Sequence, residues 1–331
     1  MFAVEFKHRL YHATLNLLWR QWSALGVAGH AMPGKQDYVL DPEMLLLFSA
    51  YFCRYDARLY DLIIDWLRKN GSLVNIQRLH ALAKRHSMDE SPSLGYMAQC
   101  VSDNGERRWK KLSGELRQKR SSAPIPLFIQ PDGTQNDFLH SADSTALQYG
   151  FLRNPYQPSG KTSAFPTDTN AAFLLQLRGA FGLSARAETI LALLVRKVCK
   201  IQEIAEVSAF AWKSIQDALE ELCAASLVIA CESQKRGRSF TLRNPQALLA
   251  LFGKSAIQFP RWDLCFQTIS LIWKALGDQR LQIVSEATVL GTLQDLLDAH
   301  MGDSLLYSGL EEMASVQAND LTKLPDRIDA I

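Results

Sequence analysis

Residues 201–243 read IQEIAEVSAFAWKSIQDALEELCAASLVIACESQKRGRSFTLR. Apolar residues at helical spacing predict a short helix over residues 201–208 and a longer one over 210–227. The longer helix has Ile215, Leu219 and Leu222 as its buried stripe. Next come VIACE and, after a turn, FTLR. Both runs are typical of short strands, so the segment predicts helix, turn, helix and β-hairpin in close succession.

The tip of this predicted hairpin is strongly basic. Gly237 supplies the backbone freedom that a tight turn needs. Lys235, Arg236 and Arg238 surround it, although three cations packed together repel one another. We therefore expect these side chains to bind a group outside the protein, and phosphate is the natural partner for such a cluster.

The flanking sequence extends the pattern. AAFLLQLRGAFG predicts a helix that ends at Gly182, Ser184 is the expected N-cap of the next helix, and Asn244-Pro245 begins a further one. The resulting order, with a wing-like hairpin after two helices, is that of a winged helix-turn-helix near residues 171–255.

The start of the longer helix is the expected recognition surface. The outward positions there are Ala211, Trp212, Lys213 and Gln216. A helix N-terminus suits phosphate, and a glutamine amide has the geometry to read adenine. Trp212 either packs under the hairpin or projects toward DNA. The full predicted DNA-binding set is Arg186, Ala211, Trp212, Lys213, Gln216, Lys235, Arg236 and Arg238.

Residues 185–243 resemble winged-helix transcription regulators of the MarR and ArsR type. The pattern IQDALEELCAASLV…GRSFTL is similar to their recognition helix, following strand and wing. The chain differs at FAWK, where the bulky Trp212 stands in place of the small polar residues common in that family. The resemblance covers about 60 residues. It implies DNA binding and transcriptional control.

The remaining chain divides into three parts. Residues 1–122 predict a helical domain, in which Asp41 and Pro42 begin one helix. Residues 123–170 are rich in proline and polar residues, and we interpret them as a linker that packs over the surface, with one short strand at PLFI. Residues 256–331 predict further amphipathic helices. The fold class is therefore mainly α, with the winged helix-turn-helix in the centre.

The charge distribution separates these parts further. The 331-residue chain has a formal net charge of only +2. Residues 1–122 contain 18 Lys and Arg against 12 Asp and Glu, a net of +6, whereas residues 256–331 contain 5 against 11, a net of −6. The acidic part should face away from any polyanion that the rest binds. Its helices are candidates to pair two chains, or to hold a ligand or a protein partner.

The composition predicts a cytoplasmic protein. The six cysteines include no C-x-x-C pair and lie mostly among apolar residues, as expected of reduced thiols. Charges interrupt the N-terminal region, and no apolar run has the roughly 18 residues that a membrane helix needs.

No catalytic or metal motif is evident. The sequence lacks H-E-x-x-H, G-x-S-x-G, P-loop and G-x-G-x-x-G patterns. His8 and His12 are four residues apart but have no third ligand nearby, and PDGTQND has the composition of a plain turn rather than a calcium loop. We therefore expect no enzymatic activity, no metal and no cofactor.

These observations favour a DNA-binding transcriptional regulator that acts as a homodimer. The alternative is a helical adaptor that uses the winged helix for protein contact. A second basic run, residues 104–120, is either a further phosphate contact or an ordinary solvated face. A continuous positive surface joining this run, Lys213 and the hairpin would favour DNA.

Overall fold

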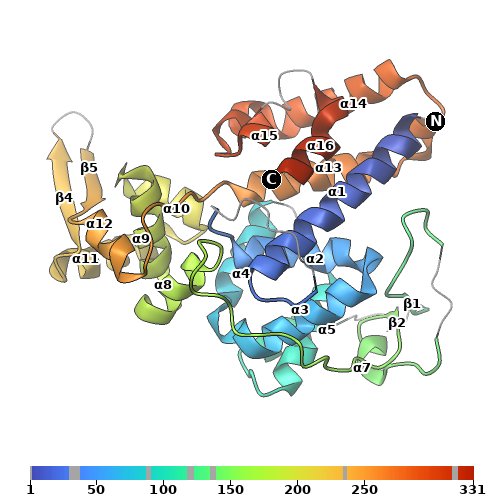
Figure 1. The fold of residues 1–331 in the computed structure, drawn as a ribbon, viewed down its shortest axis with the longest axis horizontal. Coiled ribbons are helices and arrows are strands. Elements are labelled where there is room, and N and C mark those ends of the chain that lie inside the picture. Colours follow the sequence, from blue (N-terminus) through green and yellow to red (C-terminus); the bar gives the residue numbers. More distant parts are fainter. Residues whose placement is uncertain are drawn as a thin grey trace.

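The computed structural model describes residues 2–29, 38–86, 91–117, 123–134, 139–233, 237–314 and 320–331. It is mainly helical, which confirms the predicted mainly α class, and it has a small three-stranded sheet. Figure 1 shows a large helical body and, on the left, a smaller unit that ends in a hairpin. None of the helices in the described ranges is long and apolar enough to cross a membrane.

Both ends of the chain form the helical body. Its N-terminal helices are α1 (Phe2–Ala24), α2 (Pro42–Phe52), α3 (Ala57–Asn70), α4 (Ile76–Arg85), α5 (Pro92–Asp103) and α6 (Trp109–Glu115). Its C-terminal helices are α13 (Trp262–Ala275), α14 (Glu286–Met301), α15 (Glu311–Ala314) and α16 (Leu324–Ala330). Short 3-10 turns between them are η1 (Cys53–Tyr55), η2 (Gly71–Leu73), η3 (Gln279–Gln282), η4 (Gly302–Tyr307) and η6 (Leu321–Lys323).

The two sets of helices share one apolar core. Phe48 of α2 stacks on Phe266 of α13, with the ring centroids 4.7 Å apart. At the surface, Arg9 of α1 donates to both carboxylate oxygens of Asp326 of α16 at 2.9 Å. The acidic C-terminal helices therefore pack directly on the N-terminal ones.

The N-terminal helices agree only partly with the predictions. Asp41 caps α2 as predicted, and its side chain accepts a hydrogen bond from the backbone of Met44 at 3.2 Å. The helix α5 was not predicted. Within the described part of the basic run at residues 104–120, α6 covers only Trp109–Glu115. Gly105 adopts a φ of +104° just before it, a conformation that ends regular helix.

Residues 123–170 do more than connect two parts of the chain. They contain β1 (Ile125–Pro126), α7 (Ser144–Leu147) and β2 (Phe151–Leu152), and the two strands pair in parallel. Leu127 and Phe151 are buried in the core of the helical body. The predicted strand at PLFI is thus present but shifted toward the N-terminus, and the segment contributes to the core as well as to the surface. The predicted turn at PDGT is also present, with Asp132 accepting from the backbone of Thr134 at 2.8 Å.

The smaller unit, which we call the central unit, has its own core. Its elements are α8 (Phe173–Phe181), α9 (Ala185–Arg196), β3 (Val198–Cys199), α10 (Ile201–Ser208), α11 (Trp212–Ala224), β4 (Val228–Ser233), β5 (Gly237–Leu242) and α12 (Pro245–Leu251). Ser184 and Asn244 cap α9 and α12 as predicted. Ile215, Leu219 and Leu222 of α11 are buried, which confirms the predicted stripe.

The sheet of the central unit has the strand order β3-β5-β4, and all of its pairs are antiparallel. Val198 of β3 lies opposite Thr241 of β5, and Ile229 of β4 lies opposite the same residue on the other side. The short strand β3 precedes α10 in the chain, so the sheet ties the hairpin to the start of that helix.

Candidate nucleic-acid interface

The start of α11 lies at the surface. Ala211 is the N-cap residue and is exposed. Trp212 is 53% exposed, so it projects outward instead of packing under the hairpin. The side chain of Lys213 is 68% exposed. This first turn therefore presents an indole, an ammonium group and free backbone N–H groups to solvent.

The remaining outward face of α11 is acidic. Lys213 forms an ion pair with Asp217, with Nζ and Oδ1 2.7 Å apart, and this carboxylate raises the pKa of the lysine. One turn further, Gln216 donates to Glu220 at 2.8 Å. These contacts follow from the helical i, i+4 spacing. The predicted amide and ammonium groups are thus each engaged by a carboxylate of the same helix.

A third carboxylate on this helix engages Arg186. Its Nη1 lies 3.2 Å from Oε2 of Glu221, and its Nε donates to Ser184. Asp217, Glu220 and Glu221 were not included in the predicted site, although their spacing from the predicted residues was visible in the sequence. They give the exposed side chains of α11 a net negative charge, with Lys213 as the single cation of the helix.

The hairpin presents Arg238 at the surface. Its guanidinium lies 5.3 Å from the centroid of the Phe240 ring, a cation–π contact with a residue that is fixed in the core of the central unit. Phe240 and Arg238 are two apart on β5, so they share one face of the sheet. The predicted contacts Lys235 and Arg236 lie outside the described residues.

A further group of cations was missed by the sequence analysis. Arg196, Lys197 and Lys200 are exposed around β3, and among the described residues none of the three side chains forms an ion pair. Continuing the register from Cys199 opposite Phe240 sets Lys200 opposite Ser239, so Lys200 and Arg238 belong to opposite faces of the sheet. Lys200 and Arg238 therefore lie in the same part of the sheet but do not form one cluster. The run RKVCK was the available signal, but only the strand register connects it to the hairpin.

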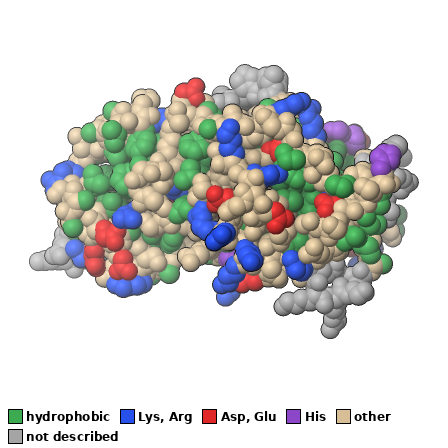
Figure 2. Space-filling view, turned by 90° about the horizontal axis from the view of Figure 1, so that it is seen from below, with side chains coloured by type: hydrophobic (Ala, Val, Ile, Leu, Met, Phe, Trp, Pro, Cys, Tyr) green, Lys and Arg blue, Asp and Glu red, His purple; other side chains and the backbone are tan. Residues whose placement is uncertain are grey.

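The basic run at α6 belongs to the helical body. The exposed cations at α6 are Arg107, Arg108, Lys110, Lys111 and Arg117. Arg108 donates to the backbone of Ser72, and Lys111 lies 3.8 Å from Glu115. In Figure 2 the Lys and Arg side chains of the visible face form separate groups, with acidic side chains among them. Among the described residues of that face, the Lys and Arg side chains form no continuous stripe.

The central unit is joined to the helical body through a buried charge network. Arg178 of α8 lies 2.6 Å from Glu43 of α2 and 2.7 Å from Glu188 of α9. Arg78 of α4 also pairs with Glu43, at 2.6 Å, and with Asp41. Burial alone would raise the pKa of Glu43, but the two guanidinium groups outweigh it and lower that pKa.

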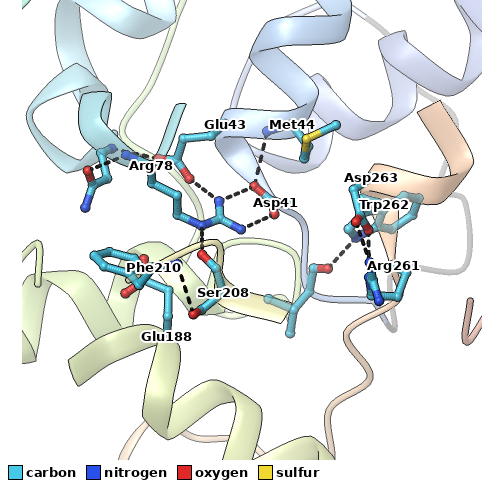
Figure 3. Close-up of polar contacts among 12 residues, drawn as sticks. Asp41, Glu43, Met44, Arg78, Glu188, Ser208, Phe210, Arg261, Trp262 and Asp263 are labelled. Atoms are coloured by element: carbon cyan, nitrogen blue, oxygen red, sulfur yellow. Dashed lines mark hydrogen bonds and ion pairs between the residues drawn. The ribbon is translucent and has the colours of Figure 1, made fainter. Parts of the chain in front are cut away.

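The same network holds the turn between α10 and α11. Figure 3 shows Arg78 between Glu43 and Asp41, with its Nε directed at the carbonyl oxygen of Ser208, 2.8 Å away. Arg85 donates to the carbonyl oxygen of Glu206 at the end of α10. Ala209, with a φ of +59°, is buried in the core of the helical body. The orientation of α11 is therefore fixed by α4.

A second charged contact lies beside this turn. Arg261 and Asp263, at the start of α13, form an ion pair at 2.7 Å, and His86 Nε2 lies 3.2 Å from the same carboxylate. Burial would raise the pKa of Asp263, but hydrogen bonds from His86 and Arg261 lower it. Figure 3 places Arg261 and Asp263 next to Trp262, whose indole nitrogen donates to the carbonyl oxygen of Val39 at 2.8 Å.

No metal site is evident in the described part of the chain, where no three His, Cys, Asp or Glu side chains gather. His8 and His12 lie with their Nε2 atoms 3.1 Å apart, a distance at which they hydrogen-bond to each other. All six cysteines are unpaired, and Cys231 of β4 is exposed.

Comparison with known proteins gave no match to a family model, a curated protein or a solved structure.

Proposed function

We propose that the central unit is a winged helix-turn-helix that binds double-stranded DNA, and that the protein regulates transcription. One observation carries this proposal. The helices α10 and α11 are joined by a three-residue turn, and the hairpin that follows pairs with β3, the strand that precedes α10. This order and pairing are what a winged helix-turn-helix requires.

The exposed cations suggest how DNA would be contacted. Arg238 on the hairpin and Lys200 at the start of α10 would each neutralise a phosphate, and the first turn of α11 would offer Trp212 and Lys213. The acidic middle of α11 is unfavourable for a phosphate backbone. Binding would therefore depend on the hairpin and the helix start, and base reading by Gln216 would require its release from Glu220.

The test is the salt dependence of binding by the full chain. Genomic fragments recovered with the protein from cells supply the specific duplex, and a scrambled duplex is the reference. With about 6 phosphate contacts, a fourfold rise in salt should weaken binding roughly a thousandfold. Absence of binding to any recovered fragment, or an affinity that does not change with salt, would contradict the proposal.

A second candidate function is a helical adaptor that binds a basic protein through α11. The observation that favours it is the row of Asp217, Glu220 and Glu221 on the exposed face. The double variant Asp217→Asn, Glu221→Gln separates the two functions. If α11 faces DNA, neutralising these acids should raise DNA affinity several-fold, because two repulsive charges are removed. If DNA affinity is unchanged, the adaptor becomes the better explanation.

We also propose that the protein acts as a homodimer on an inverted repeat, with half-sites about one helical turn apart or a multiple of that. Ten of the residues of α13 are already buried within the chain, so the pairing would use other surfaces. Light scattering and footprinting test this. A monomer that protects one asymmetric half-site would contradict it.

A further inference from the structure

A cavity of about 630 Å³ lies where three parts of the chain meet. Tyr38 of the helical body and Val195 of α9 contribute to its walls. The segment 257–260, which leads from the central unit into α13, forms another wall, and residues 306–314 form the remaining one. Cavities of this size at the junction of structural units are common places for small organic ligands.

The segment 257–260 is fixed on both sides of the cavity. The backbone of Val39 donates to the carbonyl oxygen of Gln258 at 2.7 Å, and the backbone of Arg261 donates to that of Ser308 at 2.7 Å. Phe259 packs against the core of the helical body and against that of the central unit. The cavity is therefore bounded by backbone that hydrogen bonds hold in place, so it is present before any ligand arrives.

The lining combines apolar side chains with polar groups and two carboxylates. The apolar lining residues are Tyr38, Val195, Ile257, Phe259, Leu306 and Leu310. Glu311 and Glu312 are also lining residues, and among the described lining residues there is no Lys, Arg or His. A carboxylate attracts a cation, and the rings of Tyr38 and Phe259 can favour the same charge through their π faces.

The rim adds further apolar surface. Leu306 is 51% exposed and its neighbour Tyr307 is 79% exposed. Leu306 lines the cavity, so its exposed side chain offers apolar surface that a ligand could cover. The two carboxylates would repel an anionic ligand. A small inorganic cation would leave the apolar side chains of the lining uncovered.

We propose that this cavity binds a small organic cation, with an ammonium, amidinium or phosphonium centre on an apolar or aromatic body. The cation would lie near Glu311, and the apolar body would cover Phe259 and Leu306. Because the ligand would contact Val195 of the central unit and Tyr38 of the helical body at once, it would stabilise their present arrangement. This site is independent of DNA binding, so its test does not depend on the proposed function.

The test uses two probes that differ mainly in the sign of their charge. Tetraphenylphosphonium and tetraphenylborate have similar shape and apolar surface, so a comparison isolates the electrostatic contribution. Isothermal titration calorimetry of the full chain should show binding of the phosphonium at micromolar to millimolar concentration. The borate should bind about tenfold more weakly or not at all. Equal binding of both ions, or no phosphonium binding, would overturn the proposal.

Variants locate the binding to this cavity. Glu311→Gln should weaken phosphonium binding by about fivefold, as expected for a partly solvated charge pair. Ala314→Phe, which places a ring against the cavity, should abolish it. Glu286→Gln is the matched control, because Glu286 is also an exposed first-turn glutamate but does not line the cavity. Each variant is checked by its melting temperature. If Glu311→Gln and Ala314→Phe melt like the natural chain and still bind the phosphonium unchanged, the proposal is wrong.

Discussion

Arg78 and Ser208 are 130 residues apart in the chain, yet Nε of the arginine donates to the carbonyl oxygen of the serine at 2.8 Å. The arginine is also held by Asp41 and Glu43, so the bond is made by a group that has little freedom to move. Because Ser208 ends α10, the position of α11 relative to the helical body depends on this contact.

Arg78→Ala should therefore destabilise the whole protein. It would leave Asp41 and Glu43 buried with one cation fewer, and removing one partner of a buried ion pair typically costs about 3–5 kcal/mol of the free energy of unfolding. Urea denaturation followed by circular dichroism measures this. Arg280→Ala is the control, because that side chain is 90% exposed, and it should change stability by less than about 0.5 kcal/mol. Equal stability of the two variants would show that the network does not join the two units.

The pKa of Asp263 leads to a prediction about pH. Its folded-state pKa lies below the ordinary value of 3.8, so its contribution to stability is present above about pH 4 and is lost as the pH falls toward the folded value. The difference in free energy of unfolding between the natural chain and Asp263→Asn should be largest at neutral pH. It should shrink between about pH 4 and pH 2. A difference that stays constant over this range would contradict the assigned ion pair.

The hairpin contacts can be separated from base reading. Lys200→Ala and Arg238→Ala should each weaken binding to specific and scrambled duplexes about equally, and each should lower the salt slope by about 1. Both side chains are exposed, so the melting temperatures should hardly change. Fluorescence anisotropy at several salt concentrations provides the measurement, with Arg280→Ala as a matched cation on the helical body. If the slopes of all three variants equal that of the natural chain, the hairpin does not contact DNA.

Gln216 should behave differently. If it reads a base, Gln216→Ala should cost about 1–3 kcal/mol on the preferred duplex and much less on the scrambled one. Glu220 competes for the same amide, so Glu220→Ala should strengthen specific binding. Equal losses on both duplexes would instead indicate that Gln216 contacts the DNA backbone. No loss on either duplex would indicate that it does not contact DNA.

The local features of the central unit could be predicted because they depend on neighbouring residues. Ser184 and Asn244 cap their helices through hydrogen bonds to residues two and three positions away, and the stripe of Ile215, Leu219 and Leu222 has a regular spacing. The pairing of Lys213 with Asp217 is equally local, because the two residues are four positions apart on one helix.

The features that position the candidate site depend on distant residues. Glu43 and Arg178 are 135 positions apart, and nothing in either neighbourhood indicates that they meet. The local sequence around each residue predicts only an exposed charged side chain on a helix. The extent of α6 was also misjudged, because Trp109 lies among the cations of its run but is fully buried, with its indole nitrogen directed at Gly71.

The shared core of α1–α5 and α13–α16 has a consequence for synthesis of the protein on the ribosome. Phe48 of α2 can stack on Phe266 only after the whole central unit has been translated. Until then the nascent N-terminal helices expose apolar surface that chaperones recognise. Early termination just before Trp262 would release a chain in which the central unit has its own core but the helical body remains incomplete.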